Sequence, residues 1–172
     1  MQYGHRESVD LDLFTSNNFD NIEFAHYLGQ HFSGWRYRNT DNPIGIFGYI
    51  DDIKVDFVKK IDLPLLEPII HEEGLRLLSP QDILAMKVNA ILKRGVKKDF
   101  WDIAELLNHF SVDYLIDAYI QKYPSQQLLI SIPFALTYFT DAEKTLTTIS
   151  LKDQTWEEVK DFIRTNVDEY LR

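Results

Sequence analysis

Polar and apolar residues alternate within residues 4–14, near the start of the chain. The two sets are Val9, Leu11 and Leu13 against Ser8, Asp10 and Asp12. A period of two is typical of a half-buried β-strand, and side chains two residues apart stand on the same face. The polar set therefore forms one row. Neighbouring carboxylates repel each other, and a hard divalent metal with oxygen ligands is the simplest way to hold them together.

The next stretch predicts a helix and three strands. Residues 19–32 have apolar groups at helical spacing and a capping aspartate, Asp20, at their start. Short strands are expected at 34–39, 44–50 and 53–58, the last two joined by a tight hairpin at Asp51-Asp52. Asp56 lies in the middle of the last strand, where an aspartate is disfavoured unless it has a task or a partner.

From residue 79 onward the pattern predicts helices only. Ser79 is a helix cap and Pro80 suits the first helical position. The expected helices are 80–94, 99–109, 112–123, 125–139 (interrupted or offset near Pro133) and 155–171, the last with a capping box at Thr155 and Glu158. An edge strand at 75–78 precedes them. We predict an α+β fold: a mixed β-sheet with helices in 1–78, followed by a helical domain in 79–172.

Composition narrows the functional classes. The 172 residues include no cysteine and carry a net charge of −9, which excludes disulfides and thiolate chemistry and argues against a protein that coats nucleic acid non-specifically. Basic islands at Lys59-Lys60 and at residues 93–98 could still hold one polyphosphate or RNA end. No apolar run is long enough for a membrane span and no signal peptide is apparent. We expect a cytoplasmic protein.

Three carboxylates are the strongest candidates for chemistry. Asp10, Asp12 and Asp56 lie on polar faces of strands that could be neighbours, and same-face residues of neighbouring strands approach within about 5 Å. Such a trio suits two-metal phosphoryl transfer. Alternatively, Asp10 and Asp12 are only the exposed side of an edge strand.

A second group of charged residues lies in the predicted helices. Lys87 and Arg94 are seven residues apart and share one face, so that Lys87 either meets an anion or forms a structural salt bridge. Asp99 and Asp102 are neighbours on the next helix. Capping is the ordinary role for Asp99, and Asp102 could pair with Arg94, Lys98 or Lys87. His5 is too isolated to assign a role.

Four blocks together resemble a known family. They are Gly4-His5-Arg6-x-Ser8-x-Asp10-x-Asp12-x-Phe14, Lys54-Val55-Asp56-Phe57, residues 78–87 (Leu-Ser-Pro-Gln-Asp-Ile-Leu-Ala-Met-Lys) and Arg94-Gly95-x-x-Lys98-Asp99-x-x-Asp102. Their order and spacing over about residues 4–107 are similar to those of the AbiEii/AbiGii toxin family, nucleotidyltransferases of the DNA polymerase β superfamily.

The resemblance implies a role for each motif. Asp10, Asp12 and Asp56 would bind catalytic Mg²⁺ or Mn²⁺, and Asp56 would act on the attacking hydroxyl. Lys87, Asp99 and Asp102 would join the catalytic set. Ser8, Lys87, Arg94 and Lys98 would bind the nucleotide. The implied reaction transfers a nucleotide from a nucleoside triphosphate to an acceptor such as tRNA or another RNA, in a toxin neutralised by an antitoxin.

One feature of the family pattern is missing from the printed sequence. Family members carry a Gly-Gly-Thr or Gly-Ser segment before the Gly-His-Arg block, which holds the triphosphate, whereas only three residues precede Gly4 here. Either the start of the sequence is truncated or misassigned, or the protein has lost a phosphate-binding element, so we expect the phosphate side of the site to be incomplete. The alternative to an active transferase is a catalytically impaired binding module that acts through a protein or nucleic-acid partner. A glycosyltransferase that uses Asp-x-Asp is a weaker third reading.

Overall fold

The chain folds as two units, one built on a β-sheet and the other on helices. The computed structural model describes residues 3–59 and 64–172. The sheet unit comprises residues 8–62, and the helical unit combines residues 1–7 with 63–172. The domain boundary between residues 78 and 79 stays a prediction, because contacts do not say which part folds alone. The α+β class predicted from the sequence is confirmed.

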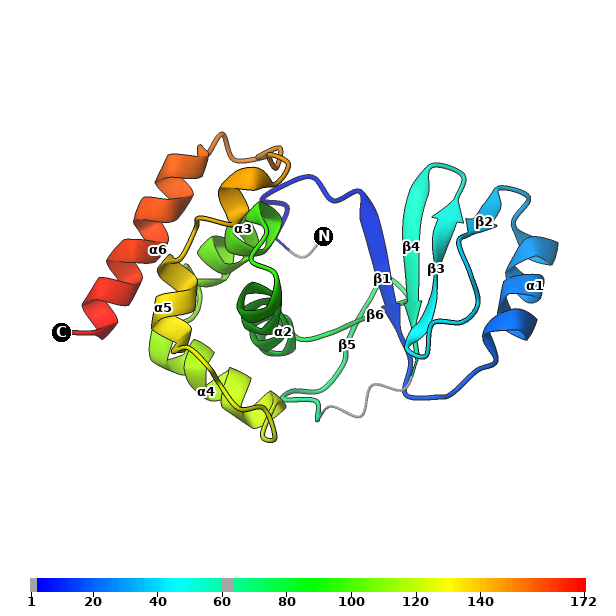
Figure 1. The fold of residues 1–172 in the computed structure, drawn as a ribbon, viewed down its shortest axis with the longest axis horizontal. Helices are drawn as coiled ribbons and strands as arrows, with labels where there is room; N and C mark the ends of the chain where they lie inside the picture. The colour runs from blue at the N-terminus through cyan, green and yellow to red at the C-terminus, as the bar shows by residue number, and fades with distance from the viewer. Residues whose placement is uncertain (1–2, 60–63) are drawn as a thin grey trace. The chain divides into compact units, whose positions relative to one another are not determined.

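Within residues 8–59, the sheet unit has four strands and one helix (Figure 1). The strands lie in the order β1-β4-β3-β2, with β1 parallel to β4 and the other neighbours antiparallel. The elements are β1 (Asp10–Phe14), α1 (Asn21–His31), β2 (Trp35–Tyr37), β3 (Gly45–Ile50) and β4 (Ile53–Val58). The predicted helix, hairpin and strands of this region are therefore present.

Local signals account for most of these elements. The Asp20 side chain accepts hydrogen bonds from the backbone N–H groups of Ile22 and Glu23, which caps α1. The helix buries Ala25 and Leu28 and packs against β2 and β3. In the β3–β4 hairpin, Asp51 takes a positive φ of 54°, a conformation that aspartate tolerates better than most residues.

The first strand is shorter and more exposed than the sequence pattern predicts. β1 begins at Asp10, and its lead-in forms an isolated antiparallel bridge instead, between Arg6 and Ser150. The expected half-buried face is also wrong, since Leu11 and Leu13 are 39% and 47% exposed. The physical reason is that β1 is an edge strand and α1 lies against the other end of the sheet.

The helical unit begins with a small hairpin and continues with helices. Its elements are β5 (Ile70–Glu72), β6 (Leu75–Leu77), α2 (Pro80–Lys93), α3 (Lys97–Leu106), α4 (Val112–Lys122), α5 (Ile132–Thr137), the 3-10 turn η1 (Ala142–Lys144) and α6 (Trp156–Tyr170). The expected cap at Ser79 and the capping box of Thr155 and Glu158 are both confirmed. β5 and η1 were not anticipated, because neither has a strong periodic pattern.

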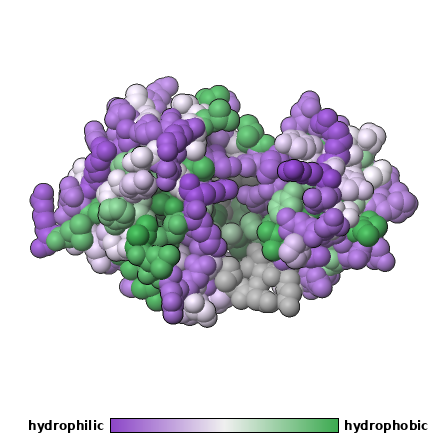
Figure 2. Space-filling view, in the orientation of Figure 1, coloured by the Kyte–Doolittle hydropathy of each residue, from purple (hydrophilic) through white to green (hydrophobic). Residues whose placement is uncertain are grey.

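One predicted helix is mostly absent. Of the range 125–139, only Ile132–Thr137 is helical, with Ser131 as its cap and Pro133 in its first turn. Proline fixes φ near the helical value and suits a helix start, so Pro133 begins α5 rather than interrupting a longer helix. The segment before it exposes Leu128 and Leu129. Figure 2 shows hydrophobic side chains gathered on the surface in this region and over α5.

The helices share one hydrophobic core. α2 packs against α3, α4 and α5, and α6 packs against α3, α4 and α5. Leu84, Phe100, Leu115 and Ile163 are fully buried there, one from each of four helices. Among the described residues, no helix is long and apolar enough to cross a membrane.

A buried ion pair joins the start of α2 to α4. Lys122 Nζ lies 2.6 Å from Asp82 Oδ1, and both side chains are almost completely buried. The Leu66 and Glu67 backbone N–H groups and the Ser79 hydroxyl also donate to the Asp82 carboxylate. Burial alone would raise the pKa of Asp82, but these hydrogen bonds and the Lys122 charge lower it below its ordinary value. No motif in the sequence indicates this pairing, because the two residues are 40 positions apart.

Breaking this pair should destabilise the helical unit. We expect Lys122→Met to lower the free energy of unfolding by about 3–5 kcal/mol, because it leaves a buried carboxylate uncompensated. Chemical denaturation followed by circular dichroism measures the change. Lys144→Met is the matched control, since Lys144 forms an exposed pair with Asp141, and it should change stability by less than about 0.5 kcal/mol. Equal effects of the two variants would contradict the assignment.

Candidate functional site

The sheet unit aligns two of the predicted carboxylates across neighbouring strands. Asp12 on β1 lies opposite Asp56 on β4, and Asp10 lies opposite Lys54. Residues directly opposite each other in neighbouring strands share a face, so Asp10, Asp12, Lys54 and Asp56 all project from one side of the sheet. The three carboxylates thus share a face, as the sequence pattern predicted. Ser8 lies beside them, with its hydroxyl 3.3 Å from Asp10 Oδ1.

Asp56 is a largely enclosed carboxylate. Its side chain is only 13% exposed and forms an ion pair with Lys54 through Oδ2. The second oxygen, Oδ1, is buried, and no hydrogen-bond partner for it is present among the described residues. A buried carboxylate oxygen without a partner loses its hydration energy, so a cationic ligand at Oδ1 would be stabilising.

The residues on this face suit a divalent cation but do not form a preorganised metal-binding site. Carboxylate oxygens are the ligands that Mg²⁺ and Mn²⁺ prefer, and Asp56 Oδ1 offers an unused donor. Within residues 3–59 and 64–172, however, no three His, Cys, Asp or Glu side chains converge closely enough for a metal ion. The ammonium of Lys54 supplies positive charge at Asp56 instead. Metal binding would therefore compete with Lys54.

The helical unit brings together the second predicted group. Lys87 on α2 bridges both carboxylates of α3: its Nζ lies 3.2 Å from Asp99 Oδ1 and 2.7 Å from Asp102 Oδ2. Arg94 forms an ion pair with the second oxygen of Asp99, with its Nε 3.1 Å from Oδ2. Of the pairings considered for Asp102, the one with Lys87 is observed. Lys98 lies half-buried in the first turn of α3.

Asp99 does not act as the cap of α3. The capping position is Val96, which makes no side-chain cap, and Asp99 is fully buried against Lys87 and Arg94. The ordinary role expected for Asp99 from its place in the sequence is therefore wrong. Its spacing of three residues from Asp102 instead allows both carboxylates to reach the same lysine.

Two residues that sequence reasoning left unassigned complete the network. Arg6 donates to Asp102 in a bidentate arrangement, from Nε to Oδ1 at 2.6 Å and from Nη2 to Oδ2 at 2.8 Å. His5 Nε2 lies 2.8 Å from Asp102 Oδ1. The five charged side chains of this network, Arg6, Lys87, Arg94, Asp99 and Asp102, are called the ionic cluster below. The signals for His5 and Arg6 in the sequence are their adjacency to the Asp-x-Asp strand and their place in the first block of the family resemblance.

Burial and charge act in opposite directions on the ionic cluster. Burial alone would raise the pKa of Asp102, but the hydrogen bonds from His5 and Arg6 and the charge of Lys87 hold this pKa far below its ordinary value. Burial would likewise lower the pKa of Lys87, and the carboxylates of Asp102 and Asp99 raise it instead. Both groups therefore stay charged at neutral pH.

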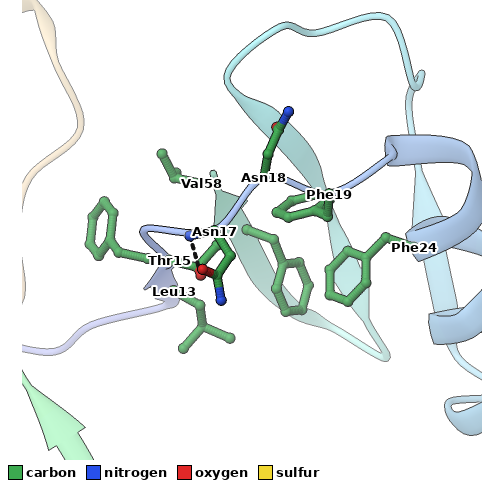
Figure 3. A pocket seen from close by; sticks show the side chains of 9 residues that line it. Leu13, Thr15, Asn17, Asn18, Phe19, Phe24 and Val58 are labelled. Carbon is green, nitrogen blue, oxygen red and sulfur yellow. Dashed lines mark hydrogen bonds between the residues drawn. The ribbon is translucent and has the colours of Figure 1, made fainter. Parts of the chain in front are cut away.

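A separate pocket opens where β1 and β4 end (Figure 3). It has a volume of about 310 Å³ and is lined by Leu13, Phe14, Thr15, Asn17, Asn18, Phe19, Phe24, Phe57 and Val58. The Phe24 ring packs edge-on against the Phe57 ring, with the ring centroids 5.1 Å apart. Leu13 and Phe57 alternate with Asp12 and Asp56 along their strands, so they point to the opposite face of the sheet. Phe14 and Val58, which also line the pocket, share the face of Asp12 and Asp56, so the pocket takes residues from both faces at the ends of the two strands.

Comparison with known structures identifies the fold class. A crystal structure of a presumed nucleotidyltransferase from H. pylori matches with a TM-score of 0.54 at 14% sequence identity, covering 97% of this chain and 82% of the other. A second Helicobacter pylori structure, JHP933, matches with a TM-score of 0.44 at 13% identity, covering 98% of this chain and 80% of the other. The first match shows that the fold is nucleotidyltransferase-like.

Sequence comparison then identifies the family. The model of the nucleotidyl transferase AbiEii toxin family, of type IV toxin–antitoxin systems, matches residues 46–170. An uncharacterized protein of Aquifex aeolicus (strain VF5) is 34% identical over 178 residues, which cover 99% of this chain and 83% of that protein. The chain belongs to the AbiEii nucleotidyl transferase toxin family. It is accordingly a nucleotidyltransferase, as the sequence motifs predicted.

Removing the Asp102 carboxylate from the ionic cluster should lower stability in a pH-dependent way. We expect Asp102→Asn to lower the free energy of unfolding by about 3–5 kcal/mol at pH 7, since it leaves buried cations uncompensated. Because the folded-state pKa of Asp102 is lowered, its contribution is complete above about pH 4 and is lost as the pH falls through that folded-state pKa. Urea unfolding of both proteins from pH 7 to pH 2 measures the difference.

The matched control for this experiment is Asp161→Asn. Asp161 forms an exposed pair with Arg164 on α6, so its replacement should cost at most about 1 kcal/mol. A stability difference for Asp102→Asn that did not shrink in acid would contradict the assignment.

Proposed function

We propose that this toxin transfers a nucleotide from a nucleoside triphosphate to a hydroxyl group of an RNA acceptor, such as the end of a tRNA. Asp10, Asp12 and Asp56 would hold Mg²⁺ or Mn²⁺ with the triphosphate. The observation that carries the proposal is the cross-strand alignment of Asp12 with Asp56, whose buried Oδ1 has no partner among the described residues. Family membership supports the same chemistry.

The reaction assigns a task to each group of residues. The acceptor oxygen attacks the α-phosphorus, the bond between this phosphorus and the bridging oxygen to the β-phosphate breaks, and pyrophosphate leaves. Asp56 is proposed to receive the proton of the attacking hydroxyl. Asp10, Asp12 and Asp56 would hold a divalent cation, which would supply positive charge against the charge that builds up on the phosphate oxygens. Lys87 and Arg94 of the ionic cluster, together with Ser8 and Lys98, are proposed to bind and orient the nucleotide.

The ionic cluster also revises the proposed roles of Asp99 and Asp102. Both carboxylates are buried and accept hydrogen bonds from cations on both oxygens. Asp102 is a poor proton acceptor, because its hydrogen bonds and cationic neighbours hold its pKa below the ordinary value, and both oxygens of Asp99 are occupied by Lys87 and Arg94. We therefore propose that Asp99 and Asp102 hold Lys87 and Arg94 in place rather than contact the reacting atoms.

A second function is favoured by one observation. Lys54 already neutralises Asp56, and the described part of the chain contains no ready group of three metal-ligating side chains. These features suit a catalytically impaired protein that keeps the fold and acts by binding a nucleic acid or an antitoxin protein. The two proposals differ in whether nucleotides are incorporated into RNA.

Replacing the carboxylates should decide between these proposals. We expect the wild-type protein to incorporate labelled nucleotide into total tRNA with Mg²⁺ or Mn²⁺. Asp12→Asn and Asp56→Asn should lower the rate at least about 100-fold, since even the supporting partners of a metal ligand are worth 10–100-fold. Asp52→Asn, in the exposed β3–β4 turn, should retain activity. A folded wild-type protein that incorporates none of the four nucleotides into RNA would favour the binding function.

Lys54 provides a further test of the metal site. We expect Lys54→Met to strengthen Mn²⁺ binding on the order of tenfold, the factor that 1.4 kcal/mol represents, because it removes the cation that competes for Asp56. Calorimetric titration without nucleotide measures the affinity. Lys144→Met removes the same charge from an exposed pair and should leave the affinity unchanged. Identical affinities in all three proteins would place the metal away from Asp56.

A further inference from the structure

The segment that precedes β1 is fastened to the helical unit at several points. The backbone N–H of Glu7 donates to the Ile149 carbonyl at 3.0 Å, and that of Leu151 donates to the His5 carbonyl at 2.9 Å. The side chains of His5 and Arg6 then both reach Asp102 on α3. Backbone and side-chain bonds therefore fix Arg6 in one geometry relative to Asp102.

Arg6 and Arg94 take opposite ends of the ionic cluster. The order of contacts is Arg6, Asp102, Lys87, Asp99, Arg94, so Lys87 lies between two carboxylates and each carboxylate has an arginine of its own. Three cations face two carboxylates. The surplus of positive charge suits an anionic ligand such as a polyphosphate, and it would vanish if either arginine were lost.

The two arginines differ in exposure. The Arg6 side chain is 11% exposed, whereas that of Arg94 is 56% exposed. Lys87 lies between these extremes, at 22%. Arg94 and Lys87 can therefore contact a ligand, while the guanidinium of Arg6 is committed to Asp102 through two parallel hydrogen bonds. Such bidentate pairs fix geometry as well as charge.

We propose that Arg6, assisted by His5, is a positioning residue for phosphate binding. By neutralising Asp102, Arg6 limits how strongly that carboxylate holds Lys87, so that the Lys87 ammonium keeps attraction for a phosphate. This inference rests on the proposed nucleotidyl transfer. It assigns a task to residues for which the proposed mechanism has none.

His5 contributes a directed hydrogen bond to the same carboxylate. An ionised carboxylate only accepts hydrogen bonds, so His5 Nε2 carries the proton that is donated to Asp102 Oδ1. Together with Arg6, it fills Oδ1 and leaves Oδ2 to Arg6 and Lys87. His5 therefore fixes which oxygen of Asp102 faces Lys87.

Binding of inorganic tripolyphosphate without metal tests this inference directly. We expect Arg6→Gln to weaken binding at least about tenfold, because truncating one partner of a buried charge pair leaves the other charge unmatched. Arg6→Lys keeps the charge and should recover affinity to within about threefold of the wild type. Arg76→Gln removes an exposed arginine from β6 and should have no effect. Calorimetry at fixed salt measures all four proteins.

Kinetics of nucleotide transfer separate positioning from a purely structural role. Arg6→Gln should raise KM for the nucleoside triphosphate about tenfold with kcat within about threefold, whereas simple loss of folded protein would lower kcat and leave KM unchanged. His5→Gln keeps a hydrogen-bond donor and should resemble the wild type, while His5→Ala should raise KM several-fold. This pair also decides the question if Arg6→Gln does not fold.

The possible outcomes distinguish this inference from the proposed function. Wild-type affinity for tripolyphosphate in folded Arg6→Gln, or equal KM values for His5→Gln, His5→Ala and the wild type, would overturn the positioning role. Absence of tripolyphosphate binding by the wild-type protein would also overturn it. Absence of nucleotide transfer, together with intact and Arg6-dependent tripolyphosphate binding, would overturn the proposed reaction alone.

Discussion

Buried carboxylates require compensation, and the helical unit is arranged around that requirement. Asp99 and Asp102 project from α3 into an environment where an unpaired charge would cost several kcal/mol. The compensating charges come from Lys87 within α2, from Arg94 at the C-terminal end of α2, and from Arg6 in the segment before β1. Asp82 repeats the arrangement with Lys122, which ties α4 to the start of α2. The charged residues therefore determine how these helices and segments are joined.

In the sheet unit, the charge of the Asp56 carboxylate is only partly compensated. Asp56 forms an ion pair with Lys54 through Oδ2, and its Oδ1 has no hydrogen-bond partner among the described residues. Full compensation makes a carboxylate a structural element, because protonation or ligand exchange would then cost all its hydrogen bonds. Partial compensation leaves a carboxylate able to accept a cation or a proton. This difference is the physical reason to assign chemistry to Asp56 and support to Asp99 and Asp102.

Sequence reasoning succeeded where local signals decide the structure. Caps at Asp20 and Ser79 and the hairpin at Asp51-Asp52 each depend on residues within a few positions of one another. It failed where distant segments meet. Arg6 bridges to Ser150, and His5 reaches Asp102 across 97 positions, and no periodic pattern encodes such contacts. The alternation in β1 was real, but an edge position without a covering helix left its apolar side exposed.

The contrast between local and overall charge bears on how the proposed RNA acceptor would be bound. The chain carries a net charge of −9, whereas the ionic cluster has more cations than carboxylates. At physiological ionic strength charges are screened over about 8 Å, so a phosphate close to Lys87 and Arg94 is attracted mainly by the cluster. Phosphates further along an RNA chain would meet a protein whose net charge is negative. Non-specific binding depends on many phosphate contacts, and this distribution provides few. An acceptor RNA would therefore be held chiefly at the end that reacts.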